Sequence, residues 1–388
     1  MSSHGVPRVS GAQVDKSEAA REKERKQIEQ YRKLEQDVVQ RVKSKDYSND
    51  TFQLVTVLLK QNPEYYTIWN YRRILLDSVF DRELSSGNTA VTENPPTAAD
   101  AAHASAAGLT LAQQEIALLI REDLQFLIPL LRSFPKCYWI WNHRSWLLAI
   151  ATSHLPPTHA LGLWQGELAL VGKMLALDSR NFHGWGYRRK VVAEIERLSG
   201  GQSMCAPEFE YTTKMIQADL SNFSAWHNRS KLIPQLLDER SAGPDERREF
   251  FDAEFELITR ALYTDEKDQS LWFYHQYLMS TLDPTNAATA AVTDGKKDVS
   301  PILSPCSNAD RLYYLEQEID NLRDMLDGAE DAKYILQALL GYSSWYLEIE
   351  AGNRKITTME MKEWLEELKK LDPLREGRWK DLEAKLGI

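Results

Sequence analysis

The chain has 388 residues, of which 43% are apolar and 27% are charged, so it is long enough to bury a full core. A net charge of -10 repels phosphate backbones and excludes nucleic acid as the main partner. We expect no membrane insertion and a cytoplasmic location, because the chain starts without a signal-peptide pattern and no apolar stretch reaches about 18 residues.

Residues 1–50 are predicted to form an N-terminal arm and a charged helix. Between Lys16 and Val42 charges of both signs alternate, as in the run from Arg21 to Arg25. Such a pattern is typical of a helix that water surrounds. The arm is therefore expected to contain a solvent-exposed helix.

One pattern of eight residues recurs five times within residues 51–280. Its copies are Tyr65–Arg72, Cys137–Arg144, Asn181–Arg188, Asn222–Arg229 and the weaker Asp268–His275. Every copy contains a tryptophan, and in four copies an arginine follows three residues later. These residues are Trp69, Trp141, Trp185, Trp226 and Trp272, with Arg72, Arg144, Arg188 and Arg229.

The spacing of the tryptophans predicts one helix pair for each copy. The intervals are 72, 44, 41 and 46 residues, and apolar residues recur at helical spacing without strand-like alternation. A single pair cannot bury its apolar face alone, so the five pairs are expected to stack into an all-α solenoid, an α-α superhelix. We expect the tryptophans to be core residues and the arginines to fork onto carbonyls or carboxylates at the turns between repeats.

The first interval exceeds the second by 28 residues (72 against 44), which indicates an insertion at residues 83–112. This tract is rich in Ser, Thr, Ala, Pro and Gly, and it has too few large apolar groups to pack. We predict a mobile loop there. Soon afterwards Pro129 interrupts the helical run from Leu118 to Leu131, which it is expected to kink or shorten.

The end of the chain divides into a linker and a last helical segment. Residues 281–309 are rich in Pro, Ser, Asn and Gly and are predicted to be a flexible linker. Residues 310–388 are predicted to form C-terminal helices that complete the solenoid, with an apolar cluster between Tyr334 and Trp345.

The period alone favours a non-enzymatic helical-repeat scaffold. The repeat core Asn-Tyr/Phe-x-x-Trp-x-x-Arg, however, resembles the repeat of protein prenyltransferase α subunits and differs from the tetratricopeptide unit of about 34 residues. Phe134–Arg144, Phe182–Arg189, Glu208–Thr213 and Leu371–Arg375 look like the compact, yeast-like α subunit of Rab (type II) geranylgeranyltransferase. The α subunit that farnesyltransferase shares with the type I geranylgeranyltransferase is the alternative.

The resemblance implies an enzyme that is active only as a heterodimer with a β subunit. That partner would hold the zinc ion and the lipid pocket, and the α subunit would wrap around it. The substrate would be geranylgeranyl diphosphate, and the acceptors would be Rab GTPases presented by a Rab escort protein. The three cysteines and eight histidines of this chain show no zinc-ligand spacing of their own.

The resemblance assigns a catalytic role to Lys136, whose ammonium would stabilise the departing diphosphate by about 2–4 kcal/mol. Without it, Lys136 reads as a solvated lysine after a proline. Tyr138 and His183 would face the active-site mouth, although a lone histidine in such a repeat is more often a packed one. His4 is a candidate regulatory ligand of the β-subunit zinc, with a disordered terminus as the alternative.

Two positions depart from the pattern of the farnesyl enzymes. Phe182 stands where those enzymes have a tyrosine, and Cys137 stands where they have an asparagine. Phenylalanine lacks the tyrosine hydroxyl, so the polar contact that this hydroxyl makes in the farnesyl enzymes is not expected here. Some of the repeat arginines could also reach the β subunit.

Overall fold

The computed structural model describes residues 17–86, 108–283, 302–303, 305–350 and 355–388. Within these residues the chain is built from helices, without a β-strand. It divides into two compact units, Met1–Gln202 and Ser203–Ile388. His4 and most of the predicted insertion and linker lie outside the described residues.

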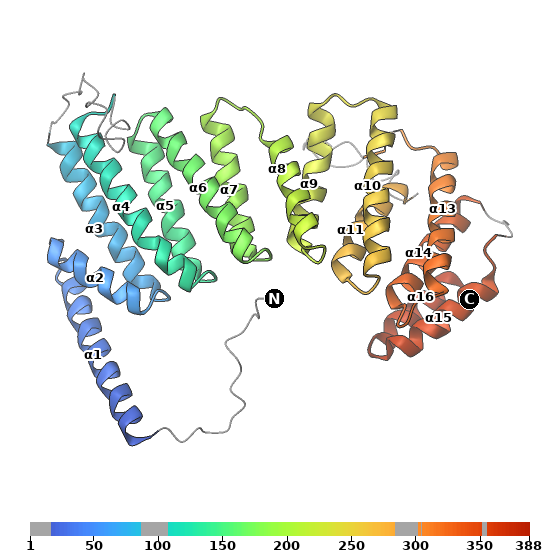
Figure 1. Cartoon of the computed structure of the whole chain (residues 1–388), viewed down its shortest axis with the longest axis horizontal. Coiled ribbons are helices and arrows are strands. Elements are labelled where there is room, and N and C mark those ends of the chain that lie inside the picture. The colour runs from blue at the N-terminus through green and yellow to red at the C-terminus, as the bar shows by residue number, and fades with distance from the viewer. Residues whose placement is uncertain (1–16, 87–107, 284–301, 304, 351–354) are drawn as a thin grey trace. The chain divides into compact units, whose positions relative to one another are not determined.

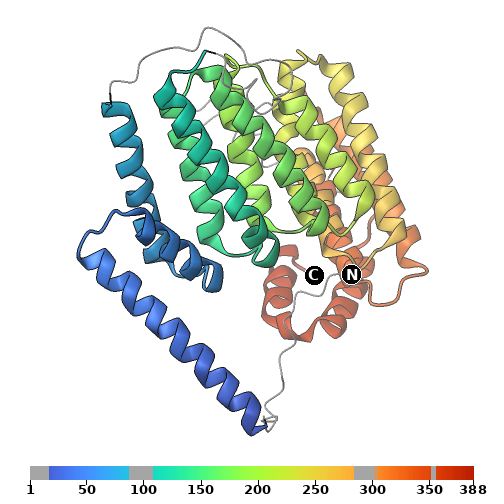
Figure 2. The same cartoon turned by 60° about the vertical axis from the view of Figure 1, so that its left-hand side comes forward.

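The first unit begins with a solvated helix and continues with three helix pairs. Its helices are α1 (Glu18–Lys43), α2 (Asn49–Gln61), α3 (Tyr66–Ser85), α4 (Leu111–Ser133), α5 (Tyr138–His154), α6 (Pro157–Leu177) and α7 (Phe182–Leu198). α2 packs against α3, α4 against α5 and α6 against α7, and Figures 1 and 2 show α4 to α7 side by side. Among the second helices of these pairs, α5 touches both α3 and α7. The rings of Tyr66 and Trp139 (centroids 4.8 Å apart) and of Tyr138 and His183 (5.2 Å) meet, so the N-terminal ends of the three helices are neighbours.

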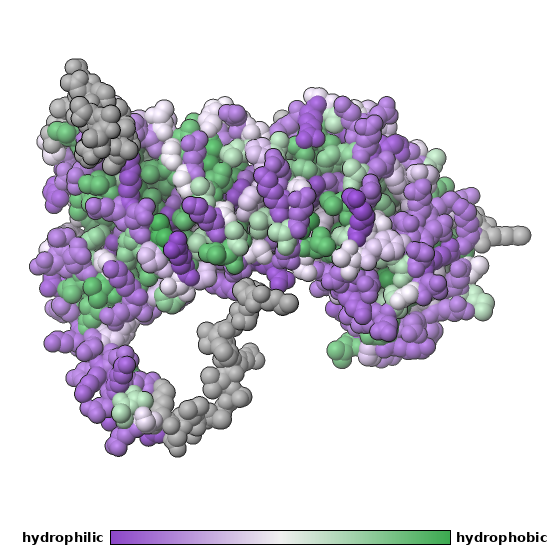
Figure 3. All heavy atoms as spheres, viewed as in Figure 1, coloured by the Kyte–Doolittle hydropathy of each residue, from purple (hydrophilic) through white to green (hydrophobic). Residues whose placement is uncertain are grey.

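Helix α1 is the predicted charged helix. Ser17 caps its N-terminus, and Val38 is the one residue of the helix that is buried. Its surface is largely hydrophilic in Figure 3. Further along, α4 runs through Pro129 and ends at Ser133, so the proline does not end the helix.

The second unit holds two further pairs and a C-terminal group of helices. These are α8 (Cys205–Ala218), α9 (Phe223–Glu239), α10 (Pro244–Thr264), α11 (Gln269–Met279), η2 (Ser280–Leu282), α13 (Asn308–Leu326), α14 (Lys333–Ile349), α15 (Thr358–Leu371), η3 (Pro373–Arg375) and α16 (Glu376–Leu386). α8 packs against α9, α10 against α11, and α14 against both α13 and α15.

All five repeat tryptophans are buried, and one hydrogen bond recurs at each of them. The indole Nε1 donates to the backbone carbonyl six residues earlier, over 2.7 to 2.9 Å. The accepting carbonyls belong to Pro63, Pro135, Ser179, Leu220 and Glu266. Because a buried indole N–H needs a partner, this bond ties the core of each pair to the loop before its second helix.

Buried carboxylates connect one helix pair to the next. Arg144 on α5 donates through Nε to Glu167 on α6 (3.0 Å) and through Nη1 to the carbonyl of Leu124 on α4 (2.7 Å). From α7, the hydroxyl of Tyr187 donates to the same Glu167 (2.6 Å). We call this set of arginine, carboxylate and ring a carboxylate bridge. It joins three successive helices through one desolvated anion.

The same bridge recurs elsewhere in each unit. In the first unit Arg72, Asp123 and His143 form it, and in the second unit Arg229, Glu254 and Tyr274 do. The accepting carboxylates lie inside helices α4, α6 and α10, not at the turns between repeats where we expected the arginines to bind. The arginines lie in the second turn of their helices, beyond the turns between repeats, and from there their guanidinium groups reach a carboxylate on the neighbouring helix, which explains the difference. Arg188 is buried as well.

The fifth repeat replaces the arginine by a histidine. His275 Nε2 is hydrogen-bonded to Glu318 (2.8 Å), and the hydroxyl of Tyr342 lies 3.0 Å from His275 Nδ1. Each of these three residues is buried. The pair that carries the weakest copy of the sequence pattern is therefore joined to the C-terminal helices in a similar way.

Candidate functional site

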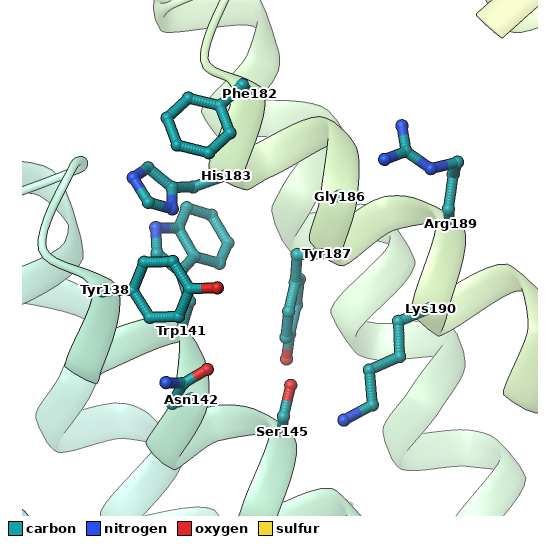
Figure 4. A pocket seen from close by; sticks show the side chains of 10 residues that line it. All are labelled: Tyr138, Trp141, Asn142, Ser145, Phe182, His183, Gly186, Tyr187, Arg189 and Lys190. Atoms are coloured by element: carbon teal, nitrogen blue, oxygen red, sulfur yellow. The ribbon is translucent and has the colours of Figure 1, made fainter.

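The predicted site residues of the second and third repeats come together at the N-terminal ends of α5 and α7. Tyr138 is the first residue of α5, and Phe182 and His183 open α7. The rings of Tyr138 and His183 meet edge to face, with centroids 5.2 Å apart and planes at 84°. Phe182 lies on the other side of His183, with centroids 3.9 Å apart. Figure 4 shows the imidazole between these two aromatic rings.

An open pocket of about 340 Å³ lies between α5 and α7 beside these rings. Its lining residues are Tyr138, Trp141, Asn142, Ser145, Phe182, His183, Gly186, Tyr187, Arg189 and Lys190, as Figure 4 shows. One wall is aromatic, and the α7 wall contributes two cations. Such a pocket suits a ligand with an apolar part and an anionic part.

Lys136 lies on the exposed loop that connects α4 to α5, two residues before Tyr138. The carbonyl of the preceding residue, Pro135, accepts the Trp141 indole N–H at 2.9 Å. Burial lowers the pKa of His183, Glu64 raises it, and the charge of Lys136 lowers it, with a net shift downward. The net shift favours the neutral form of the His183 ring.

Cys137 holds the capping position of α5 but makes no capping hydrogen bond. Its Sγ donates instead to the carbonyl of Pro63 at 3.2 Å, and burial raises the pKa of the thiol. In the third repeat Asn181 holds the same position and accepts from the amides of His183 and Gly184. A thiol is a poor acceptor for helix amides, so α5 lacks the cap that α7 has.

The pocket lining also includes one residue of the bridges, Tyr187, that the sequence pattern did not single out. Tyr187, two residues after Trp185, is buried, belongs to the carboxylate bridge through Glu167, and packs against the ring of Trp141, whose centroid is 5.0 Å away. Burial and the nearby Glu167 raise the pKa of its hydroxyl well above the usual value. The sequence did contain a signal for this position, because four of the five copies have an aromatic or imidazole ring two residues after the tryptophan.

No group of three or more His, Cys, Asp or Glu side chains that could hold a metal ion occurs among the described residues. His4, the predicted regulatory zinc ligand, is not one of those residues. In the part of the chain that the structure describes, no helix is both long and apolar enough to cross a membrane.

The family model for the protein prenyltransferase alpha subunit repeat matches this chain five times, at residues 48–79, 120–151, 164–195, 206–236 and 251–282. Each match contains one of the five repeat tryptophans. The geranylgeranyl transferase type-2 subunit alpha of Schizosaccharomyces pombe is 33% identical over 99% of this chain and 98% of its own length. The chain belongs to the family of type-2 geranylgeranyl transferase α subunits.

Other members of this type-2 α-subunit family support the assignment. The Saccharomyces cerevisiae protein is 33% identical over 67% of each chain. The Homo sapiens protein is 32% identical over a match that covers 73% of this chain and 43% of that longer protein.

A solved structure supports the fold. A chain of the Candida albicans protein geranylgeranyltransferase-I complexed with GGPP matches with a TM-score of 0.57 and 18% identity, over 92% of this chain and 91% of that chain. The predicted all-α fold of the α-α superhelix class is thereby confirmed, as is the predicted family.

Proposed function

We propose that this type-2 α subunit works as one half of a Rab geranylgeranyltransferase in the cytoplasm. Its β subunit would bind zinc and geranylgeranyl diphosphate, and the acceptors would be C-terminal cysteines of Rab GTPases presented by an escort protein. The names of the relatives favour this assignment over the α subunit shared by farnesyltransferase and the type I enzyme.

The observation that carries the proposal is an exposed aromatic edge beside Lys136. The residue three before the tryptophan is Tyr66, Tyr138 or Phe182 in the first unit, with exposed fractions of 50%, 55% and 68%. These residues open α3, α5 and α7, whose N-terminal ends are neighbours. Exposed aromatic side chains gathered on one edge are typical of a protein interface, so this edge supports docking of the β subunit.

In the heterodimer, zinc on the β subunit would bind the acceptor cysteine and favour its thiolate form, which is the nucleophile. The residues of this chain would act on the departing diphosphate. The ammonium of Lys136 would attract the negative charge that develops on the diphosphate as the bond between its oxygen and the lipid carbon breaks. This attraction would stabilise the transition state by about 2–4 kcal/mol. The Tyr138 hydroxyl and the neutral His183 ring can donate hydrogen bonds to the same oxygens or contact the acceptor peptide.

Lys136→Ala in the intact heterodimer tests this role. Single-turnover transfer to a Rab with escort protein should slow by roughly 30- to 900-fold, at about 1.36 kcal/mol for each factor of ten. Lys267→Ala is the matched control, because Lys267 also precedes its tryptophan by five residues and lies in the other unit. An unchanged rate for Lys136→Ala would refute the role. Efficient farnesylation of a CaaX peptide would refute the Rab assignment.

A further inference from the structure

The loop that carries Lys136 is held by a carbonyl that accepts two hydrogen bonds. The oxygen of Pro135 accepts from Trp141 Nε1 at 2.9 Å and from Asn181 Nδ2 at 3.1 Å. The first donor belongs to the same helix pair, and the second belongs to the next pair. Because this carbonyl is part of the planar peptide group that joins Pro135 to Lys136, the two bonds fix the orientation of that peptide group and with it the position of the Lys136 Cα.

The same Asn181 carboxamide also holds the other half of the site. Its Oδ1 accepts from the amide of His183 at 3.0 Å and from the amide of Gly184 at 3.4 Å. The side chain is buried and lies directly before Phe182, at the cap of α7. One side chain therefore connects the loop of Lys136 to the first turn of the helix that carries His183.

We propose that Asn181 is a positioning residue that sets the ammonium of Lys136 relative to the His183 ring. This inference rests on the role proposed above for Lys136. The cap requires only an oxygen acceptor, whereas the tie to Pro135 requires an amide N–H donor. An asparagine meets both requirements at this position. Aspartate would keep the cap and lose the tie, and alanine would lose both.

The test is a double-mutant cycle in the heterodimer, read as single-turnover transfer of geranylgeranyl to a Rab presented by the escort protein. Asn181→Ala should slow transfer by roughly tenfold when Lys136 is present, because a small displacement of a catalytic group is costly. In the Lys136→Ala background the same substitution should slow it by less than about twofold, since its effect passes through the lysine. The affinity for geranylgeranyl diphosphate should change less than the rate.

Asn222→Ala is the matched control. Asn222 precedes its tryptophan by four residues, as Asn181 does, and caps α9 through the amide of Ala225 at 3.1 Å in the other unit. It should lower the melting temperature about as much as Asn181→Ala without the tenfold loss of rate. If Asn181→Ala does not assemble with the β subunit, Asn181→Asp, which keeps the cap, enters the same cycle.

The outcomes separate two failures. An equal loss of rate in both lysine backgrounds, or no loss with Lys136 present, overturns the positioning role and leaves the role of Lys136 intact. An unchanged rate for Lys136→Ala alone refutes the proposed catalytic role, and the positioning role falls with it. A tenfold loss that disappears in the Lys136→Ala background supports both.

Discussion

Glu167→Gln should strongly destabilise the first unit, because it removes the anion of the carboxylate bridge and leaves the buried cation, Arg144, in place. Arg144 is buried, and Glu167 accepts from both its guanidinium and the Tyr187 hydroxyl. Removing the anion leaves a guanidinium uncompensated in a dry site, which costs about 3–5 kcal/mol. For a unit of this size each kcal/mol lowers the melting temperature by about 2–4 °C. We therefore expect a drop of roughly 6–20 °C.

Two comparison variants make this magnitude informative. Glu210→Gln removes an exposed ion pair to Lys214 within one helix, at 2.8 Å, and should leave the melting temperature almost unchanged, because water screens such a pair. Tyr187→Phe removes one hydrogen bond to the buried carboxylate and should cost about 1.5–3 kcal/mol.

The assay is thermal unfolding of the heterodimer, followed by circular dichroism for each variant at one protein concentration. If Glu167→Gln lowers the melting temperature no more than Glu210→Gln does, the bridge does not hold the repeats together and the reasoning fails. The combined variant of Glu167→Gln with Tyr187→Phe should cost less than the sum of the two, because both act on one anion.

Two further predictions concern the carboxylate bridge of Asp123 and the N-terminal cap of α5. Burial lowers the pKa of His143 below its usual 6.5, and Arg72 and His143 together hold the pKa of buried Asp123 at about 2, although burial alone raises it. The unfolded chain therefore binds protons that the folded chain does not, so the melting temperature should fall as the pH drops below about 6.5 and again below about 4. His143→Tyr should make the first step smaller but not remove it, because burial also lowers the pKa of His183. Cys137→Asn should restore the missing cap of α5 and raise the stability by about 0.5–1 kcal/mol, while the reverse change Asn222→Cys should lower it by a similar amount, both measured as melting temperatures. A decrease for Cys137→Asn would show that the site cannot accommodate the amide.

The helix pairs could be predicted because their signal is local. A tryptophan at a repeated place in an apolar stripe reports burial directly, whatever it contacts, as Trp69 and Trp272 illustrate. The indole hydrogen bond to the carbonyl six residues earlier could not be predicted in the same way. It depends on the path of the loop, and nothing in the pattern of apolar residues records that path.

The partners of the arginines were harder to predict, since the spacing between partners varies. Asp123 lies 51 residues after Arg72, and Glu167 lies 23 residues after Arg144. A signal did exist on α6, where Glu167 falls between Trp164 and Val171 on the buried stripe. A carboxylate at a core position of an amphipathic helix needs a buried cation. The position of Glu167 therefore predicts that it has a cationic partner, but it does not identify which residue that partner is.

The candidate site uses exposed positions of the repeat that lie beside its buried frame. Lys136 and Tyr138 are exposed, whereas the neighbouring Trp141 and Arg144 are buried and support the frame. Substitutions at the two kinds of position should therefore separate activity from stability. Lys136→Ala should abolish most of the transfer rate with a melting temperature within about 1–2 °C of the unchanged protein, because Lys136 is exposed and an exposed side chain contributes within about 0.5 kcal/mol. A large thermal shift for Lys136→Ala would instead mean that the lysine supports the loop, and its effect on the rate could then no longer be assigned to the diphosphate.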